Sequence, residues 1–245
     1  MAIPYFTFNG TDSRTYGLTL IGNQPYMRPQ ERVQHVTIPG RSGEVTLLEG
    51  ESVYESYIRT VEFTADTAQM FYVARWLQGS GILTFSNWPK LSQQARVIGA
   101  YTMERLSRNL ERYRGAVQFY CEPLLSNSDI TDSVTLSGSG ATHSVNNPGI
   151  TPTRPRIEVT VGEATWWPDF VVNGSHFTVQ LSRVSGASVT SLVIDSEAGT
   201  VVSADGTINL LPYSTGEFPV LARGTNTIVT RNMYQAVLSR RVKYL

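Results

Sequence analysis

The sequence comprises 245 residues, of which 41% are hydrophobic, enough for one or two ordinary globular cores. Charged residues make up only 16%, and 20 basic residues balance 20 acidic ones, with 12 against 11 among residues 1–125. Because neither half carries a net charge of any size, the composition argues against sequence-specific nucleic-acid binding and against attraction to an anionic membrane. The single cysteine, Cys121, excludes an intrachain disulfide and therefore a disulfide-stapled secreted scaffold.

The amino terminus, Met-Ala-Ile-Pro-Tyr-Phe, lacks the basic and apolar regions of a signal peptide, and no apolar run reaches the length of a membrane span. We therefore expect the protein to be made in the cytoplasm and kept or assembled there. Gly, Ser, Thr, Val and aromatic residues are plentiful, and they suit half-buried strands better than solvated helices. The composition predicts a mainly β fold.

Short strands separated by turns are predicted for the first third of the chain. Residues 33–38 and 45–48 read as strands, and Gly40-Arg41-Ser42-Gly43 predicts a tight structural loop between them. The loop lacks the Gly-x-Ser-x-Gly spacing of a hydrolase elbow and does not open a helix, so a turn is favoured over a nucleophilic serine.

Residues 57–64 resume the alternation of a half-buried strand, although Arg59 falls on the apolar side. Asp66 and Gln69 then stand at capping-box spacing before a single helix that Gly79 ends. We expect this helix to be amphipathic and to pack on the sheet. The residues that recur at helical spacing are Ala68, Phe71, Tyr72, Arg75 and Trp76.

Residues 103–113 fit two structures, because Met103, Leu106 and Leu110 keep helical spacing while Ser107-Arg108-Asn109 could turn a hairpin. We favour the hairpin, extending over residues 95–122. A last strand of this part, residues 116–122, ends before Pro123.

A domain junction is predicted near Ser126, because residues 126–149 are rich in Ser, Thr, Asn and Gly and poor in large apolar side chains. This gives two domains, residues 1–125 and 126–245. In the second, Asn173-Gly174 and Asp205-Gly206 lie between alternating runs and predict hairpin turns. Regular short strands without helices indicate a β-sandwich.

Candidate catalytic and metal-binding residues do not form a convincing set. His35, His143 and His176 are far apart in sequence and have no partner at metal-ligand spacing. Asp195 and Glu197 could be the paired carboxylates of a glycosidase, but a strand end with its turn explains them more simply. No phosphate-binding glycine loop is present. We expect neither catalysis nor a cofactor.

Three further residues have both a structural and a functional interpretation. Cys121 lies in Val-Gln-Phe-Tyr-Cys, where a small buried hydrophobe is favoured over a nucleophile. Trp166 and Trp167 could stack on sugar rings, but packing at a sheet edge or subunit contact is the favoured interpretation.

A series of short motifs follows in a fixed order along the chain. Those in the first half are Phe6-Thr7-Phe8-Asn9-Gly10, Ser13, Tyr16-Gly17-Leu18, Ile38-Pro39-Gly40-Arg41-Ser42-Gly43, Leu83-Thr84-Phe85-Ser86 and Phe119-Tyr120-Cys121-Glu122-Pro123. Those in the second half are Asn147-Pro148-Gly149, Pro155-Arg156-Ile157, Ile194-Asp195-Ser196-Glu197, Phe218-Pro219-Val220-Leu221 and Gly224-Thr225-Asn226. The order of the first set resembles that of the distal tail proteins of siphophages. The second half resembles the domain that follows in the same family, and the likeness covers nearly the whole chain.

The resemblance implies an N-terminal ring-forming β-sandwich with a helix and a long hairpin, followed by a C-terminal galectin-like β-sandwich. It also implies a structural protein of the virion tail tip, a homohexameric hub between the tail tube and the tail tip or baseplate. The implied partners are the tail-tube, tape-measure and tail-tip or baseplate proteins, with a receptor-binding protein as a further candidate. Saccharide binding is not implied, because the sequence lacks a matched set of His, Asn, Arg and Trp at galectin sugar-binding positions.

A closed ring requires contacts between different surfaces of neighbouring subunits, and exposed strand edges can supply them. The predicted hairpin carries Arg105, Arg108, Arg112 and Arg114 near its tip, and we hypothesise that they meet acidic residues of an adjacent subunit. A solvated tip is the simpler alternative. The competing functions are a carbohydrate-binding module that uses Trp166 and Trp167 on host cell-wall glycans, and a cell-wall hydrolase, for which no acid, base, nucleophile or metal set is apparent.

Overall fold

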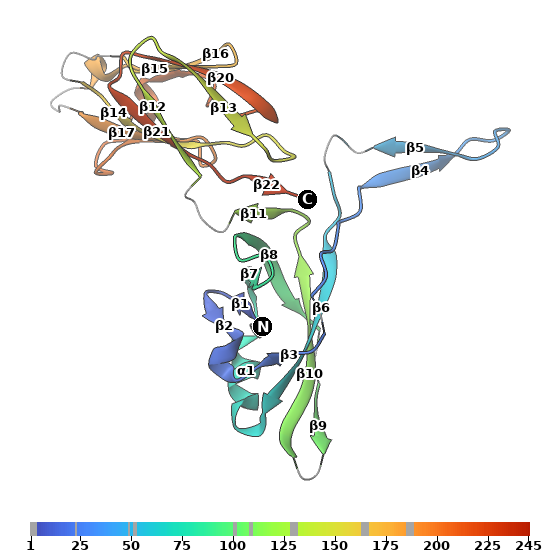
Figure 1. Cartoon of the computed structure of the whole chain (residues 1–245). Helices are drawn as coiled ribbons and strands as arrows, with labels where there is room; N and C mark the ends of the chain where they lie inside the picture. Colours follow the sequence, from blue (N-terminus) through green and yellow to red (C-terminus); the bar gives the residue numbers. More distant parts are fainter. Residues whose placement is uncertain are drawn as a thin grey trace. The chain divides into compact units, whose positions relative to one another are not determined.

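The computed structural model describes residues 4–22, 24–48, 50, 53–99, 102–107, 110–127, 132–162, 167–184 and 189–245. The chain divides into two compact units, Met1–Ser128 with Leu245 and Asp129–Tyr244. The fold is mainly β, as the composition predicts, and one α-helix is present among the described residues (Figure 1). No helix in this part of the chain is long and apolar enough to cross a bilayer.

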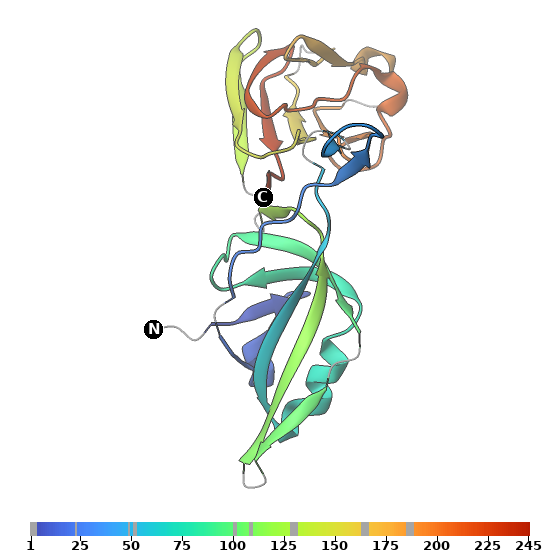
Figure 2. The same cartoon turned by 90° about the vertical axis from the view of Figure 1, so that its right-hand side faces the viewer.

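The first unit is built on one antiparallel sheet with strand order β2-β1-β7-β8-β10-β6-β3. In Figures 1 and 2, β6 and β10 run side by side along its length, and β9 and β11 pair with β10 and β8. The strands are β1 Phe6–Phe8, β2 Thr11–Asp12, β3 Thr19–Leu20, β6 Tyr57–Asp66, β7 Ser80–Phe85, β8 Leu91–Ile98, β9 Met103–Ser107, β10 Leu110–Cys121 and β11 Leu125–Asn127. Two 3-10 turns, η1 Ser13–Tyr16 and η2 Thr67–Gln69, and the helix α1 Met70–Trp76 complete this body.

Aromatic side chains fill the core of the first unit. Phe6 stacks on Trp76 with ring centroids 5.4 Å apart and meets Phe119 edge-on at 5.9 Å. Such ring pairs contribute about 0.5–1.5 kcal/mol each beyond their buried area. The period-2 alternation of residues 57–64 is confirmed, because Val61 and Phe63 are fully buried, and Arg59 is buried on the same side.

The Asn9-Gly10 turn after β1 ties this strand to β7. The Asn9 side chain accepts a hydrogen bond from the backbone N–H of Ile82 (3.1 Å) and donates one to the Ser80 carbonyl (3.3 Å). A Cβ at Gly81 would lie 1.6 Å from the Asn9 Oδ1, so only glycine fits beside this amide. The opening Phe-Thr-Phe-Asn-Gly motif is therefore a strand followed by a structural clamp.

A second hairpin of the first unit, here called the arm hairpin, consists of β4 Val33–Thr37, the loop of residues 38–43 and β5 Glu44–Leu48. Its two strands pair only with each other, so it shares no sheet with the rest of the unit (Figure 1). In the loop, Gly40 and Gly43 adopt positive φ angles, 82° and 83°. The hairpin expected from the ambiguous segment is also present, as β9 and β10.

The second unit is a sandwich of two five-stranded antiparallel sheets, ordered β12-β21-β14-β17-β18 and β13-β20-β15-β16-β19. Buried side chains from both sheets form one core. The elements are β12 Ser133–Ser137, β13 Thr142–Asn147, β14 Arg156–Thr160, β15 Asp169–Val172, β16 Ser175–Val179, η3 Leu181–Arg183, β17 Ser191–Asp195, β18 Thr200–Ser203, η4 Leu211–Tyr213, β19 Ser214–Gly216, β20 Gly224–Arg231, β21 Gln235–Ser239 and β22 Lys243–Tyr244.

The Asn173-Gly174 turn joins β15 to β16, as predicted, with φ angles of 49° and 92°. The turn predicted at Asp205-Gly206 is also present, because Gly206 has a φ angle of 73° and its N–H donates to the Ser203 carbonyl (2.8 Å). The chain returns beside β18 through the antiparallel bridge between Val202 and Asn209. The polar segment of residues 126–149, at the start of which we expected the junction, contains the two edge strands β12 and β13. Leu136 and Val145 are enough to anchor them, because both side chains enter the core.

Candidate interaction site

Each face of the arm hairpin combines apolar and polar side chains. The register places Val36, Val45 and Leu47 on one face, together with Gln34, which lies opposite Leu47. On the other face, near the loop, Thr46 contacts His35 Nδ1 at 3.3 Å and Glu44 approaches it at 3.8 Å. Leu48 lies on this second face, opposite Val33.

Several apolar side chains of this hairpin are exposed to solvent: Val36 is 40% exposed, Ile38 43%, Leu47 49% and Leu48 65%. An isolated two-stranded hairpin is at best marginally stable in water. Val36 and Leu47 lie on one face and Leu48 on the other, so exposed apolar side chains occur on both faces of the hairpin. The loop residues Arg41 and Ser42 are exposed at its end.

Helix α1 differs from its prediction in two ways. The Asp66–Gln69 capping box does not form: β6 continues to Asp66, which pairs with Arg112, and Gln69 makes no side-chain cap. The helix packs on the sheet through Val73 and the following Leu77, while Phe71 and Tyr72 are exposed. The expected packing face was therefore wrong for these two aromatics.

Trp76 fixes the orientation of α1. Its indole N–H donates to the Phe8 carbonyl (3.2 Å), and its ring packs against Phe6 and Tyr16. With Trp76 held inward, Phe71, Tyr72 and Arg75 form a stripe on the outer side of the helix, here called the α1 patch, since residues three and four apart are neighbours on a helix surface.

The arginines near the tip of the β9–β10 hairpin are partly engaged within their own chain. Arg112 pairs with Asp66 (3.4 Å) and Arg114 with Glu62 (2.6 Å), both across the β10–β6 pairing. The hydrogen bond that the Arg114 guanidinium donates to the Glu62 carboxylate raises the pKa of Arg114. Arg105 lies on β9, and Arg108 lies outside the described residues. Their contact with a neighbouring subunit stays a prediction.

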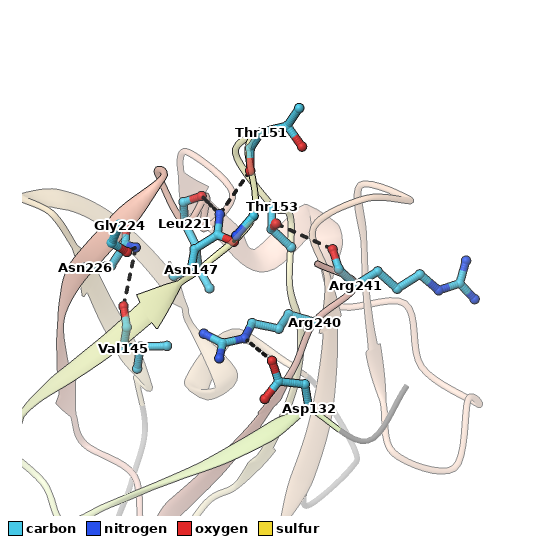
Figure 3. A network of polar contacts seen from close by, with 11 residues as sticks. Asp132, Val145, Asn147, Thr151, Thr153, Leu221, Gly224, Asn226, Arg240 and Arg241 are labelled. Carbon is cyan, nitrogen blue, oxygen red and sulfur yellow. Dashed lines mark hydrogen bonds and ion pairs between the residues drawn. The ribbon is translucent and has the colours of Figure 1, made fainter. Parts of the chain in front are cut away.

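Polar side chains in the second unit hold loops rather than forming a reactive site. Asn147 donates to the carbonyls of Thr151 (3.0 Å) and Leu221 (3.3 Å), and Asn226 donates to those of Ala222 and Gly224 (Figure 3). Both asparagines are fully buried. The asparagines of the Asn147-Pro148-Gly149 and Gly224-Thr225-Asn226 motifs therefore have a structural role, which is to hold loops through their hydrogen bonds.

A partly buried ion pair joins Asp132, just before β12, to Arg240, just after β21. The guanidinium of Arg240, only 8% exposed, lies 3.0 Å from a carboxylate oxygen of Asp132, whereas the side chain of Arg241 extends the opposite way (Figure 3). A hollow of about 360 Å³ nearby is lined by both signs of charge. Its lining residues are Arg154, Arg156, Asp195, Glu197, Ala198, Ser239, Arg240 and Arg241.

The remaining candidates occupy ordinary structural positions. No group of three His, Cys, Asp or Glu side chains in the described residues could hold a metal ion. Asp195 accepts the backbone N–H groups of Glu197 and Ala198, as a strand-end turn requires. Cys121 is fully buried, and burial raises the pKa of its thiol to about 11, which confirms a buried hydrophobe.

Of the two candidate glycan-contacting tryptophans, Trp166 lies outside the described residues. Trp167 is 52% exposed, and its indole N–H donates to Ser182 Oγ (2.9 Å). The Asn232 side chain donates to the Trp167 carbonyl (3.2 Å). The polar end of the indole is thus already paired.

No family model matches the sequence, and no curated protein matches it. A solved structure that does match is the Dit protein (gp 19.1) of SPP1, described as a paradigm of the hub adsorption apparatus in phages that infect Gram-positive bacteria. The alignment covers 100% of both chains with a TM-score of 0.77 at 16% sequence identity. The chain has the fold of SPP1 Dit.

The resemblance read from the motifs is confirmed at the level of the fold, over both units. The strands of the arm hairpin were predicted, but the exposure of their apolar side chains was not. The exposure of the α1 patch had no sequence signal, because any amphipathic helix turns its larger apolar residues inward by default.

Proposed function

We propose that this protein is a structural hub of a phage tail. In this proposal it forms a homohexameric ring at the tail tip and joins the tail tube to the tail-tip or baseplate proteins, around the tape-measure protein and the DNA path. A receptor-binding protein is a further candidate partner. The observation that carries the proposal is the fold shared with SPP1 Dit across both units.

The surface of the first unit supports a ring-forming role for residues 1–125. Its arm hairpin exposes aliphatic side chains, and its helix exposes two adjacent aromatic ones. Exposed apolar surfaces of this kind are typical of protein–protein contacts, in which aromatic residues are enriched. The role requires no cofactor and no catalytic residue.

Negative-stain electron microscopy of the purified protein over a range of concentrations tests this function. We expect class averages of a closed six-fold ring with a central hole, more abundant at high concentration. If the isolated protein stays monomeric, the same preparation is mixed with tail tubes purified from the phage. Failure to cap those tubes, or a closed ring of another symmetry, would contradict the proposal.

A further inference from the structure

Arginine side chains gather at one end of the sheet β12-β21-β14-β17-β18, around the hollow of about 360 Å³. We propose that this hollow binds a phosphate group through Arg154, Arg156 and Arg241. All the residues that line it belong to the second unit, so the proposal does not depend on the ring. It assigns the sandwich a ligand-binding role of its own.

Strand register brings several lining residues of the hollow to one face of the sheet. Arg156, in the central strand β14, lies opposite Asp195 of β17 on one side and opposite Ser239 of β21 on the other. The next residue of β14, Ile157, and its partner Ile194 are fully buried. Because side chains alternate along a strand, Arg156 and its two neighbours are on the outer face of the sandwich.

Two further arginines lie just beyond the ends of these strands. Arg154 precedes Arg156 by two residues, and Arg241 follows Ser239 by two residues. The residue between each pair is buried, so the alternation continues, and Figure 3 shows the side chain of Arg241 turned away from that of Arg240. Arg154 and Arg241 are exposed, and no carboxylate of the described residues lies within ion-pair distance of either. Their N–H groups are therefore available to a ligand.

The two carboxylates that line the hollow do not cancel its positive charge. They belong to Asp195 and Glu197, and they face four lining arginines. Asp195 Oδ1 accepts the backbone N–H groups of Glu197 (3.1 Å) and Ala198 (2.9 Å), so part of its negative charge is already compensated. The hollow therefore favours an anionic ligand.

Two of the four arginines already have a counter-charge. Arg156 lies 3.3 Å from Glu158 of the same strand, and Arg240 lies 3.0 Å from Asp132. Arg240 is nevertheless only 8% exposed, and its Nη1 has no hydrogen-bond partner within the described ranges. A buried cation with an unsatisfied N–H is stabilised by negative charge nearby, even without direct contact. An anion in the hollow supplies that charge.

A phosphate group suits these donors better than a carboxylate does. Each guanidinium presents a planar fork of N–H groups that can bind two oxygen atoms side by side. A carboxylate has two oxygens and one negative charge, whereas the phosphate of an ester has three free oxygens and about 1.5 to 2 negative charges near pH 7. Since a water molecule occupies about 30 Å³, the hollow also has room for the group that carries the phosphate.

Isothermal titration calorimetry of the full chain with inorganic phosphate, at constant ionic strength, tests the site. We expect saturable binding of one phosphate per chain. Arg154→Gln and Arg241→Gln should each weaken it about tenfold, because each removes charge-assisted hydrogen bonds. The matched control is Arg183→Gln, which removes the same charge from an exposed position of η3 outside the hollow. All three side chains are exposed, so the urea midpoints of the variants should equal that of the wild type.

Two further titrants identify the source of the phosphate and test the choice of ligand. Tighter binding of glycerol 3-phosphate than of inorganic phosphate supports a site for phosphate esters, and equal affinities support a site for the free ion. Acetate that binds as tightly as phosphate would contradict the assignment to phosphate. Absence of saturable binding, or an equal loss of affinity in the Arg183→Gln control, would overturn the site. None of these results depends on six-fold rings, so the proposed hub is tested separately.

Discussion

Two hairpins of this chain have similar sequence patterns and opposite environments. In β15–β16 the alternating residues Phe170, Val172 and Phe177 are buried in a five-stranded sheet. In the arm hairpin the alternating residues Val36 and Leu47 remain exposed on two strands that no third strand joins. The alternation of side chains thus decides which of them share a face of the strand. In the arm hairpin the exposed apolar side chains indicate a surface for a partner.

The largest loss of stability is expected from a substitution in the β15–β16 hairpin, whose apolar side chains are buried. Phe177→Ala removes a ring that packs 4.9 Å from that of Phe218 and leaves a cavity in the sandwich core. Large-to-small changes of this kind cost about 3–5 kcal/mol. Urea unfolding followed by circular dichroism should show the loss in the transition of the second unit. If the urea midpoint of the variant equals that of the wild type, the side chain of Phe177 is no better buried than those of the arm hairpin.

A smaller loss of stability is expected from a change at Asn226, which anchors the Asn173-Gly174 turn between β15 and β16. Asn226 accepts a hydrogen bond from the Asn173 side chain (2.7 Å) and holds the carbonyls of Ala222 and Gly224. Asn226→Ala leaves these buried groups unpaired and should lower the free energy of unfolding by about 2–3 kcal/mol. Asn146→Ala, at an exposed position of β13, is the matched control and should be nearly neutral. If Asn226→Ala and Asn146→Ala lower the free energy of unfolding equally, the hydrogen bonds of Asn226 do not anchor the turn.

The rates at which two thiols react compare the exposure of the arm hairpin with that of the core of the first unit. At pH 8 a Leu47→Cys thiol in the arm hairpin should react with a disulfide reagent on the order of 100 times faster than native Cys121. Burial, which raises the pKa of Cys121 to about 11, leaves little thiolate there. Absorbance during labelling measures both rates. Comparable rates would mean that the first-unit core opens readily.

The same thiol makes stability depend on pH in a defined direction. Because the folded-state pKa of Cys121 lies above its ordinary value of 9.0, the free energy of unfolding should fall as pH rises from about 9 through 11. The expected loss is about 1–2 kcal/mol for the first unit. In the Cys121→Ala variant the urea midpoint should depend less on pH between about 9 and 11. If the midpoints of the variant and of the wild type depend on pH in the same way, Cys121 does not cause the loss of stability.

The smallest effect on stability is expected from Leu47→Ala. This exposed side chain lacks a covering partner within the described part of its own unit, so the unfolding free energy should change by less than about 0.5 kcal/mol. Ring formation, measured by sedimentation velocity, should nevertheless decrease. A large loss of stability in the monomer would show that the arm hairpin packs on its own chain.

Much of the fold could be predicted from local patterns. The strand of residues 57–64, the loop from Gly40 to Gly43 and the turn at Asn173-Gly174 follow from alternation and from residues that tolerate positive φ angles. The edge strands β12 and β13 were missed because each has a single buried apolar side chain, Leu136 in β12 and Val145 in β13. The α1 cap was misassigned because Asp66 is bound by Arg112, distant in sequence.

The sequence by itself determined the mainly β class and which side chains of a strand share a face, since backbone geometry makes side-chain alternation a local property. Only the tertiary structure decided which of those sides are covered. Whether Phe71 or Val73 turns inward depends on Trp76 reaching the Phe8 carbonyl across the fold. Burial is a property of contacts between distant segments, so the surfaces left open for partners emerged only from the folded chain.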